Sequence, residues 1–207
     1  TAFGNGGPLS HKHGFDGIGQ AMCGSVYLTG EAGQPMRAGV NWVDCGTASL
    51  AAFGTLAALL ARGNTGRGQQ VETALLQTAL AFNNPPLLEQ ATVAPNREAT
   101  GNLGIVSAPS DVFRCTDGWV MVSSVGTLMF RRWARLVGAG DWLDDPRFAD
   151  DAARARHGAE ASARMAAWMA TRSTAEALAE LEAANLPAAP ILSPQQALDD
   201  PHVRAAG

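Results

Sequence analysis

The sequence has little charge, and this shortage excludes two classes of partner. Asp, Glu, Lys and Arg make up 16% of the 207 residues, and the formal net charge is −4. Because there is no long block of basic residues, the chain lacks the electrostatic footprint of a nucleic-acid-binding protein and the basic helix of a membrane-surface protein. We therefore expect neither nucleic acid nor a membrane as a partner.

Residues that hold metals or form disulfides are also scarce. The three cysteines form no CxxC pair and lie far apart, at Cys23, Cys45 and Cys115. The four histidines are scattered, at His11, His13, His157 and His202. Such spacing favours neither a zinc site nor a disulfide framework, so we expect no metal and a reducing, cytoplasmic setting.

Well-known catalytic and phosphate-binding motifs are missing as well. The chain has no GxSxG, and no GxGxxG follows a predicted strand. The glycine-rich segment at residues 65–69 lacks the Lys-Ser/Thr pair of a phosphate loop, so it is typical of a turn between a helix and a strand.

What the chain does have is a long uncharged stretch. No charged residue occurs from Cys45 to Ala61, and the stretch ends at Arg62-Gly63. It is short for a membrane span and contains Gly, Ser and Thr. A helix without a polar face is typically buried. We therefore predict a buried core helix over residues 44–62, with Gly63 in the left-handed position after its end.

Asp44 stands at the head of this helix, and the residues alone allow two interpretations. It is either a capping acid that accepts hydrogen bonds from free helix amides, or a nucleophilic carboxylate that attacks an activated acyl group. In the second case, the amides at the helix start would suit developing negative charge. Periodicity does not separate the two interpretations.

Three other positions precede this helix and have two interpretations each. Asp16 is either an exposed helix acid or a second carboxylate near the site. Gln20 is either a buried, satisfied amide or a substrate contact. His13, with Lys12, belongs either to a solvated loop or to a phosphate contact.

Apolar spacing and turn signals divide the chain into two parts. Helices are predicted over residues 14–27, 44–62, 74–82, 127–137 and 150–170, and from Ser173 and Ser193 onward. A short strand is predicted at residues 69–73. Asp117-Gly118 between two β-like runs, 111–115 and 119–122, predicts a hairpin. The breaker-rich residues 89–104 are the expected linker between parts 1–88 and 105–192.

Several short motifs, weak singly, are specific in their order. They are G-F-D-G-I-G-Q-A-M-C-G at 14–24, Thr29-Gly30, Asp44, R-x-x-T-G-R-G-Q-x-V at 62–71, S-A-P-S-D-V-F at 107–113, D-G-W-V at 117–120 and D-P-H at 200–202. The set resembles the family III CoA-transferases (CaiB/BaiF), the group that includes formyl-CoA transferase and the α-methylacyl-CoA racemases. The resemblance covers nearly the whole chain.

The resemblance implies an α/β fold. Residues 1–88 would be part of a large, Rossmann-like domain, helix-rich with one or two strands. Residues 105–192 would be a small α+β domain with a β-hairpin and helices. Residues 193–207 would begin a return segment to the large domain. Since the match is to the middle and later part of the family, we expect a fragment of a longer enzyme that forms an interlocked homodimer.

The resemblance also implies the chemistry. Asp44 matches the family's nucleophile, which forms an anhydride with the acyl group of a CoA thioester and then an aspartyl-CoA thioester. Coenzyme A would be a substrate, with no covalently bound cofactor, and a carboxylic acid would be the acceptor. The implied substrate or CoA contacts are His13, Phe15, Asp16, Gln20, Leu75, Gly101, Asn102 and Gly104. The last three belong to a loop expected to cover the site.

Departures from the family pattern leave two alternatives. Racemases of the group carry His where this chain has Phe15, which favours transfer over a racemase-like reaction. The family's N-terminal segments, with much of the CoA site, have no counterpart here, so a non-catalytic or partner-dependent fragment is the other alternative. The loop at Gly101–Gly104 is less glycine-rich than in formyl-CoA transferase, so formate and oxalate are not implied.

Overall fold

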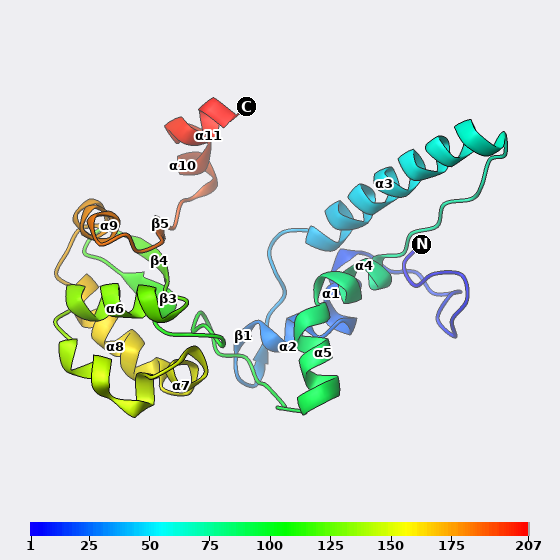
Figure 1. Cartoon of the computed structure of the whole chain (residues 1–207). Helices are drawn as coiled ribbons and strands as arrows, with labels where there is room; N and C mark the ends of the chain where they lie inside the picture. The colour runs from blue at the N-terminus through cyan, green and yellow to red at the C-terminus, as the bar shows by residue number, and fades with distance from the viewer. Residues whose placement is uncertain (207) are drawn as a thin grey trace. The chain divides into compact units, whose positions relative to one another are not determined.

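The computed structural model describes residues 1–206 and divides into two compact units, Thr1–Gly101 and Asn102–Gly207 (Figure 1). The boundary falls within the predicted linker, residues 89–104. Each unit has its own secondary structure and its own apolar cluster. The fold as a whole is helix-rich with small antiparallel sheets, as expected.

The first unit consists mainly of helices. Its elements are α1 (Asp16–Met22), α2 (Ser25–Leu28), β1 (Gly30–Glu31), β2 (Gln34–Pro35), α3 (Trp42–Thr65), α4 (Leu75–Phe82) and α5 (Asn84–Val93). The strands β1 and β2 pair antiparallel with each other. Helix α1 packs against both α3 and α4, so the start of α3 is the part of that helix held by its neighbours.

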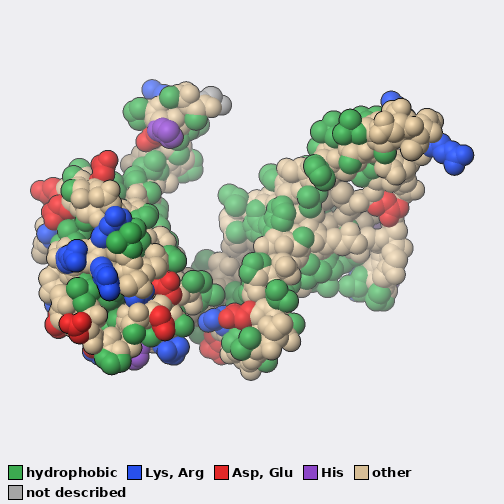
Figure 2. Space-filling model, in the orientation of Figure 1, with side chains coloured by type: hydrophobic (Ala, Val, Ile, Leu, Met, Phe, Trp, Pro, Cys, Tyr) green, Lys and Arg blue, Asp and Glu red, His purple; other side chains and the backbone are tan. Residues whose placement is uncertain are grey.

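Helix α3 forms where the uncharged stretch predicted it, but the prediction that it is buried is wrong. Only Val43 and Gly46 are buried, whereas Phe53 is 72% exposed and Leu60 is 75% exposed. Figure 2 shows hydrophobic side chains along the outside of this helix. An all-apolar pattern indicates that a helix packs against another apolar surface. It does not indicate whether that surface belongs to the same 207 residues.

The length and composition of α3 would also allow it to cross a membrane, and only 17% of its most apolar window is buried. Core helices of larger soluble proteins have the same length and composition, so this property alone does not indicate a span.

Two helix ends differ from the prediction, and a glycine with positive φ lies at each. The predicted helix 14–27 is interrupted at Gly24, whose φ is +88°. Helix α3 continues through Gly63 and ends at Gly66, whose φ is +69° and whose N–H donates to the carbonyl of Arg62 over 2.8 Å. Both glycines adopt the left-handed conformation that other residues avoid.

The predicted strand at residues 69–73 is wrong, and part of the predicted linker is helical. Residues 69–73 are irregular because no strand lies beside them in the described chain to complete a ladder. Residues 89–93 belong to α5, which starts at Asn84 with proline in its first turn. Proline is favoured there because the first helical amides have no partner in any case.

The second unit contains the predicted hairpin. Strands β3 (Ser110–Arg114) and β4 (Trp119–Ser123) pair antiparallel, and β5 (Ala188–Pro190) adds to the other edge of β4. The sheet order is therefore β3-β4-β5. The loop between β3 and β4 is closed by the N–H of Cys115, which donates to the carbonyl of Gly118 over 2.9 Å.

Helices complete the second unit, and α8 and α9 pack on the sheet. The helices are α6 (Thr127–Leu136), the 3-10 helices η1 (Gly140–Asp144) and η2 (Pro146–Phe148), α7 (Asp151–Arg156), α8 (Gly158–Met169), α9 (Thr174–Ala183), α10 (Pro194–Asp199) and α11 (Pro201–Ala206). The predicted helix 150–170 is two helices that meet at His157. The helices predicted from Ser173 and Ser193 onward are present, and each of these serines forms a capping box.

An extensive core holds the second unit together. Trp133 of α6, Met165 of α8 and Leu181 of α9 are fully buried against the inner face of the sheet, where Val120 and Val122 alternate with outward residues. Leu128 of α6 and Ala159 of α8, in contrast, are exposed. Each lies near the start of its helix, where the neighbouring elements cover the helix incompletely.

Candidate active site

Asp44 lies in the first turn of α3, and its side chain is exposed. Among residues 1–206, its carboxylate has no hydrogen-bond or ion-pair partner. The N-cap residue of the helix is Asn41, and the Asn41 side chain makes no capping bond. The first amides of α3 therefore have to be satisfied by another group.

That group is Asp16, from the first turn of α1. One oxygen of its carboxylate accepts from the N–H of Val43 over 2.8 Å and from the N–H of Asp44 over 3.1 Å. Asp16 is only 3% exposed. The interpretation of Asp16 as an exposed helix acid is thus wrong, and so is the interpretation of Asp44 as the cap. The capping carboxylate and the free carboxylate are two different residues, side by side at one helix end.

Gln20 follows Asp16 by one turn of α1 and is a buried, satisfied amide. Its Nε2 donates to Asp16 Oδ1 over 2.5 Å and to the carbonyl of Val40 over 3.3 Å. Its Oε1 accepts from the N–H of Ala38 over 2.9 Å. Gln20 therefore ties the segment leading into α3 to the same carboxylate that caps the helix.

Leu75 lies behind the same helix end. It is partly buried and packs on a small cluster formed by Cys23, Val43 and Ala79. Within α3, a Cβ at Gly46 would collide with the ring of Phe82, so α3 and α4 approach each other closely there. Leu75 therefore packs on the cluster to which Val43, the residue before Asp44, belongs.

His13 and Phe15 line a surface hollow of about 370 Å³ that ends where α1 begins. His11 and Lys12 line it too, and the Phe15 side chain is 80% exposed. Of the predicted site residues, Asp16 contacts the backbone of Asp44 directly, and Gln20 holds Asp16. His13 and Phe15 lie in the same unit, before α1, and their proximity to Asp44 stays a prediction.

The predicted loop residues lie at the unit boundary. Gly101 belongs to the first unit, with φ of +64°, and its N–H donates to the carbonyl of Gly30 over 2.7 Å. Asn102 and Gly104 belong to the second unit, where the N–H of Gly104 donates to the carbonyl of Ser110 over 2.6 Å. These hydrogen bonds give Gly101 and Gly104 a structural role within their own units. The role of the loop in covering Asp44 stays a prediction.

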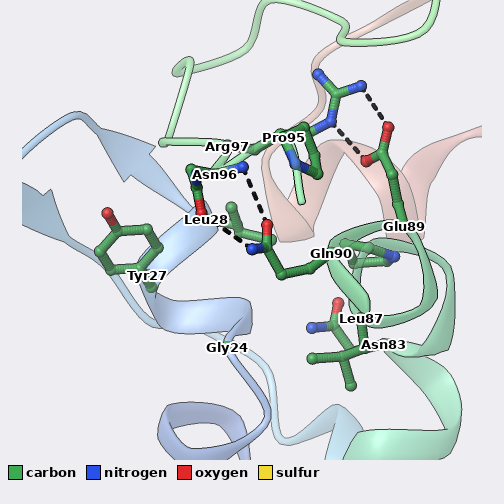
Figure 3. A pocket seen from close by; sticks show the side chains of 11 residues that line it. Gly24, Tyr27, Leu28, Asn83, Leu87, Glu89, Gln90, Pro95, Asn96 and Arg97 are labelled. Atoms are coloured by element: carbon green, nitrogen blue, oxygen red, sulfur yellow. Dashed lines mark hydrogen bonds and ion pairs between the residues drawn. The ribbon is translucent and has the colours of Figure 1, made fainter. Parts of the chain in front are cut away.

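A separate cavity of about 280 Å³ was missed by the sequence analysis (Figure 3). Tyr27 and Leu28 of α2 face Gln90 of α5 across it, and none of the predicted site residues lines it. At its rim, the guanidinium of Arg97 binds the carboxylate of Glu89 through two hydrogen bonds, which lower the pKa of Glu89. Only the spatial approach of α2 to α5 creates this cavity, and no local pattern signals it.

No group of three or more His, Cys, Asp or Glu side chains arranged to hold a metal ion is found in residues 1–206. All three cysteines are free thiols. At the start of α3, the N–H groups of Val43 and Asp44 are occupied by Asp16, so they are not the free amides expected to face developing negative charge. In the described chain, the Asp44 carboxylate is the group left free there, and a free carboxylate is suited to nucleophilic attack.

Comparison with known proteins gives consistent results. The model of a family described as CoA-transferase family III matches residues 1–207. The chain is 33% identical over 204 residues to the succinyl-CoA–D-citramalate CoA-transferase of Chloroflexus aurantiacus, covering 98% of this chain and 51% of that protein. It is 32% identical to the formyl-CoA:oxalate CoA-transferase of Streptomyces avermitilis, covering 94% of this chain and 52% of that protein.

A solved structure agrees with these relatives. The crystal structure of a CaiB/BaiF family protein from Brucella suis superposes with a TM-score of 0.80 at 29% identity, covering 100% of this chain and 55% of that one. The chain thus spans about half the length of the proteins it matches.

Proposed function

Because the chain belongs to CoA-transferase family III, we propose that it carries the nucleophile of an acyl-CoA:carboxylate CoA-transferase, and that this nucleophile is Asp44. The observation that supports the proposal most directly is that the capping carboxylate and the free carboxylate at the start of α3 belong to different residues. Asp16 caps the helix, which leaves the Asp44 carboxylate exposed and without a partner among residues 1–206. A carboxylate must be free in this way to attack a substrate.

The reaction proceeds by covalent transfer. A carboxylate oxygen of Asp44 attacks the thioester carbonyl of the donor, forming a C–O bond and breaking the C–S bond, so that a mixed anhydride and CoA thiolate result. The thiolate then attacks the aspartyl carbonyl, which releases the donor acid and leaves an aspartyl-CoA thioester. The acceptor carboxylate attacks this thioester, and the released thiolate attacks the acceptor's carbonyl in the new anhydride. These steps yield the acceptor's CoA thioester and regenerate Asp44.

The hollow beside α1 is the proposed point of contact with the CoA part of the substrate. Lys12 is a cation there, and His13 and Phe15 supply an imidazole and an exposed aromatic face. Phe15 offers no titratable group, which favours transfer over the racemase-like alternative. Coenzyme A is a substrate in this proposal, and no covalently bound cofactor takes part. The segment Gly101–Gly104 covers the acylated aspartate, and the full-length protein is a cytoplasmic homodimer.

The acyl groups remain to be assigned by experiment. One similar relative is named for succinyl-CoA and D-citramalate, the other for formyl-CoA and oxalate. Identity to the two is nearly equal, at 33% and 32%. A panel of donors should therefore include both a dicarboxylic and a one-carbon acyl-CoA, with dicarboxylic acids as acceptors.

The proposal is tested in the full-length protein by trapping. Incubation with each acyl-CoA, followed by hydroxylamine and mass spectrometry, should modify Asp44. Asp44→Asn should retain the fold and lose the modification and turnover. Modification at any other residue, or full turnover by Asp44→Asn, would sink the assignment.

One observation favours a second candidate for the chain taken by itself. The apolar surface of α3 is largely exposed, and exposed apolar surfaces of this extent mark interaction sites. The 207 residues alone would then be a partner-dependent fragment that binds CoA poorly. Calorimetric titration of this chain with CoA tests the idea, because saturable binding would contradict it.

A further inference from the structure

The first turn of α3 is stabilised by a residue from a different helix. Asp16 lies 28 positions before Asp44 and accepts from the backbone N–H groups of Val43 and Asp44. Caps usually come from the residue directly before the helix, but the side chain of Asn41 makes no such bond here. The position of the Asp44 backbone is therefore set by α1 rather than by the local sequence.

Gln20 makes this arrangement rigid. It is 1% exposed and joins the second oxygen of Asp16 to the carbonyl of Val40 and the N–H of Ala38. The chain entering α3 and the first turn of α3 are thus held by one buried pair of side chains on one face of α1. A buried polar pair whose hydrogen bonds are all made specifies a single geometry.

Close packing between α1 and α3 reinforces the pair. A Cβ at Gly19 of α1 would lie 3.0 Å from Cγ1 of Val43, so the two helices approach as nearly as a glycine allows. Any loss of the Asp16 bonds would let the start of α3 move relative to α1, and Asp44 would move with it.

These contacts also explain why Asp16 does not bind substrate itself. Both of its oxygens are occupied by protein donors, and the residue is 3% exposed. Its contact with α3 is through the backbone N–H groups of Val43 and Asp44 alone.

We propose that Asp16, supported by Gln20, is a positioning residue for the nucleophile, acting through the backbone N–H groups of Val43 and Asp44. This inference rests on the proposed function, since it assigns to Asp16 a role in the acylation of Asp44. It also moves Asp16 and Gln20 out of the set of residues that contact substrate.

The test compares Asp16→Asn with Ser173→Ala in the full-length protein. Asp16→Asn keeps the shape but removes the charge and one acceptor. Ser173→Ala removes the side-chain cap of α9 in the second unit, so it reports the effect of losing an ordinary cap. We expect Asp16→Asn to slow single-turnover acylation of Asp44 by about ten- to hundredfold, with little change in KM, because small displacements of a nucleophile have effects of that size. Ser173→Ala should leave acylation unchanged.

A second measurement does not depend on activity. Hydrogen–deuterium exchange of the peptide around residues 41–46 should become faster in Asp16→Asn and stay unchanged in Ser173→Ala. The inference is overturned if Asp16→Asn is acylated at the wild-type rate, or if its KM rises while kcat holds, which would make Asp16 a substrate contact. If the wild-type protein is not acylated at Asp44 at all, the proposed function itself fails, and that outcome is recognised before any variant is made.

Discussion

The two units of this chain bury apolar surface to very different degrees. In the second unit, Trp133, Met165 and Leu181 are fully buried in one continuous core. In the first unit, the buried apolar cluster consists of Cys23, Val43 and Ala79. The unit with the candidate nucleophile is thus the one with the smaller core. The longest helix of that unit, α3, leaves most of its apolar surface exposed.

The contrast predicts that one aromatic in the second unit matters more than any exposed apolar residue of α3. Trp133→Ala leaves a large cavity in a packed core, so the free energy of unfolding should fall by about 3–5 kcal/mol. Leu60→Ala is the control, because Leu60 is 75% exposed, and it should change stability by less than about 0.5 kcal/mol. Denaturant unfolding of both variants measures this. A comparable loss in Leu60→Ala would break the contrast.

The crossing of α3 and α4 is a place in the first unit where packing is as tight as in a core. Gly46→Ala would press a methyl group into the ring of Phe82 and should cost about 1–3 kcal/mol. Gly63→Ala is matched to it, since it lies in the same helix with nothing within 4 Å of its Cβ position. It should stabilise the helix by about 0.5–1 kcal/mol. In thermal unfolding, the Tm should fall in Gly46→Ala and rise in Gly63→Ala. Such opposite shifts would sharpen the contrast between the two ends of α3.

Charging the exposed face of α3 should change association rather than stability. In the 207-residue chain, Phe53→Glu combined with Leu60→Glu should reduce self-association and binding of an apolar dye. The free energy of unfolding should stay within about 0.5 kcal/mol. Leu128→Glu in the second unit is the control, because Leu128 is a single exposed apolar residue at 59% exposure. Analytical ultracentrifugation would contradict the prediction if both proteins associated equally.

The smallest expected effect concerns pH and the second unit. The N–H and hydroxyl of Thr174 both donate to Asp117, each over 2.7 Å, and these bonds lower the pKa of Asp117 below its ordinary value of 3.8. A lowered pKa means that Asp117 contributes stability above pH of about 3.8 and loses it as the pH falls through the folded-state pKa. Between pH 5 and pH 2, the free energy of unfolding should therefore decline less in Asp117→Asn than in the wild type.

Features whose partners are close in sequence were predictable. The hairpin around Asp117-Gly118 and the capping box of Ser173 depend on residues that lie within a few positions of each other. A short stretch of sequence therefore contains every residue needed to predict each of these features. The family motifs likewise led to Asp44 without any knowledge of distances.

Features that depend on distant partners were not predictable. The cap of α3 joins residues 28 positions apart, and no spacing rule relates Asp16 to the amides of another helix. The exposure of α3 was missed because hydropathy shows that a helix is apolar but not which surface packs against it. The choice between Gly63 and Gly66 at the helix end failed because both have the composition of a C-terminal signal, and only the backbone angle of Gly66 distinguishes them.

The separation of cap and candidate nucleophile has a practical consequence for the study of this family member. The Asp44 side chain makes no hydrogen bond or ion pair among residues 1–206, because the first amides of α3 are capped by Asp16. Asp44 can therefore be exchanged for Asn or Ala without loss of the helix. Under the proposed function, such variants of the full-length protein would bind a donor or acceptor without consuming it and would serve as traps for identifying the acyl groups in a metabolite extract.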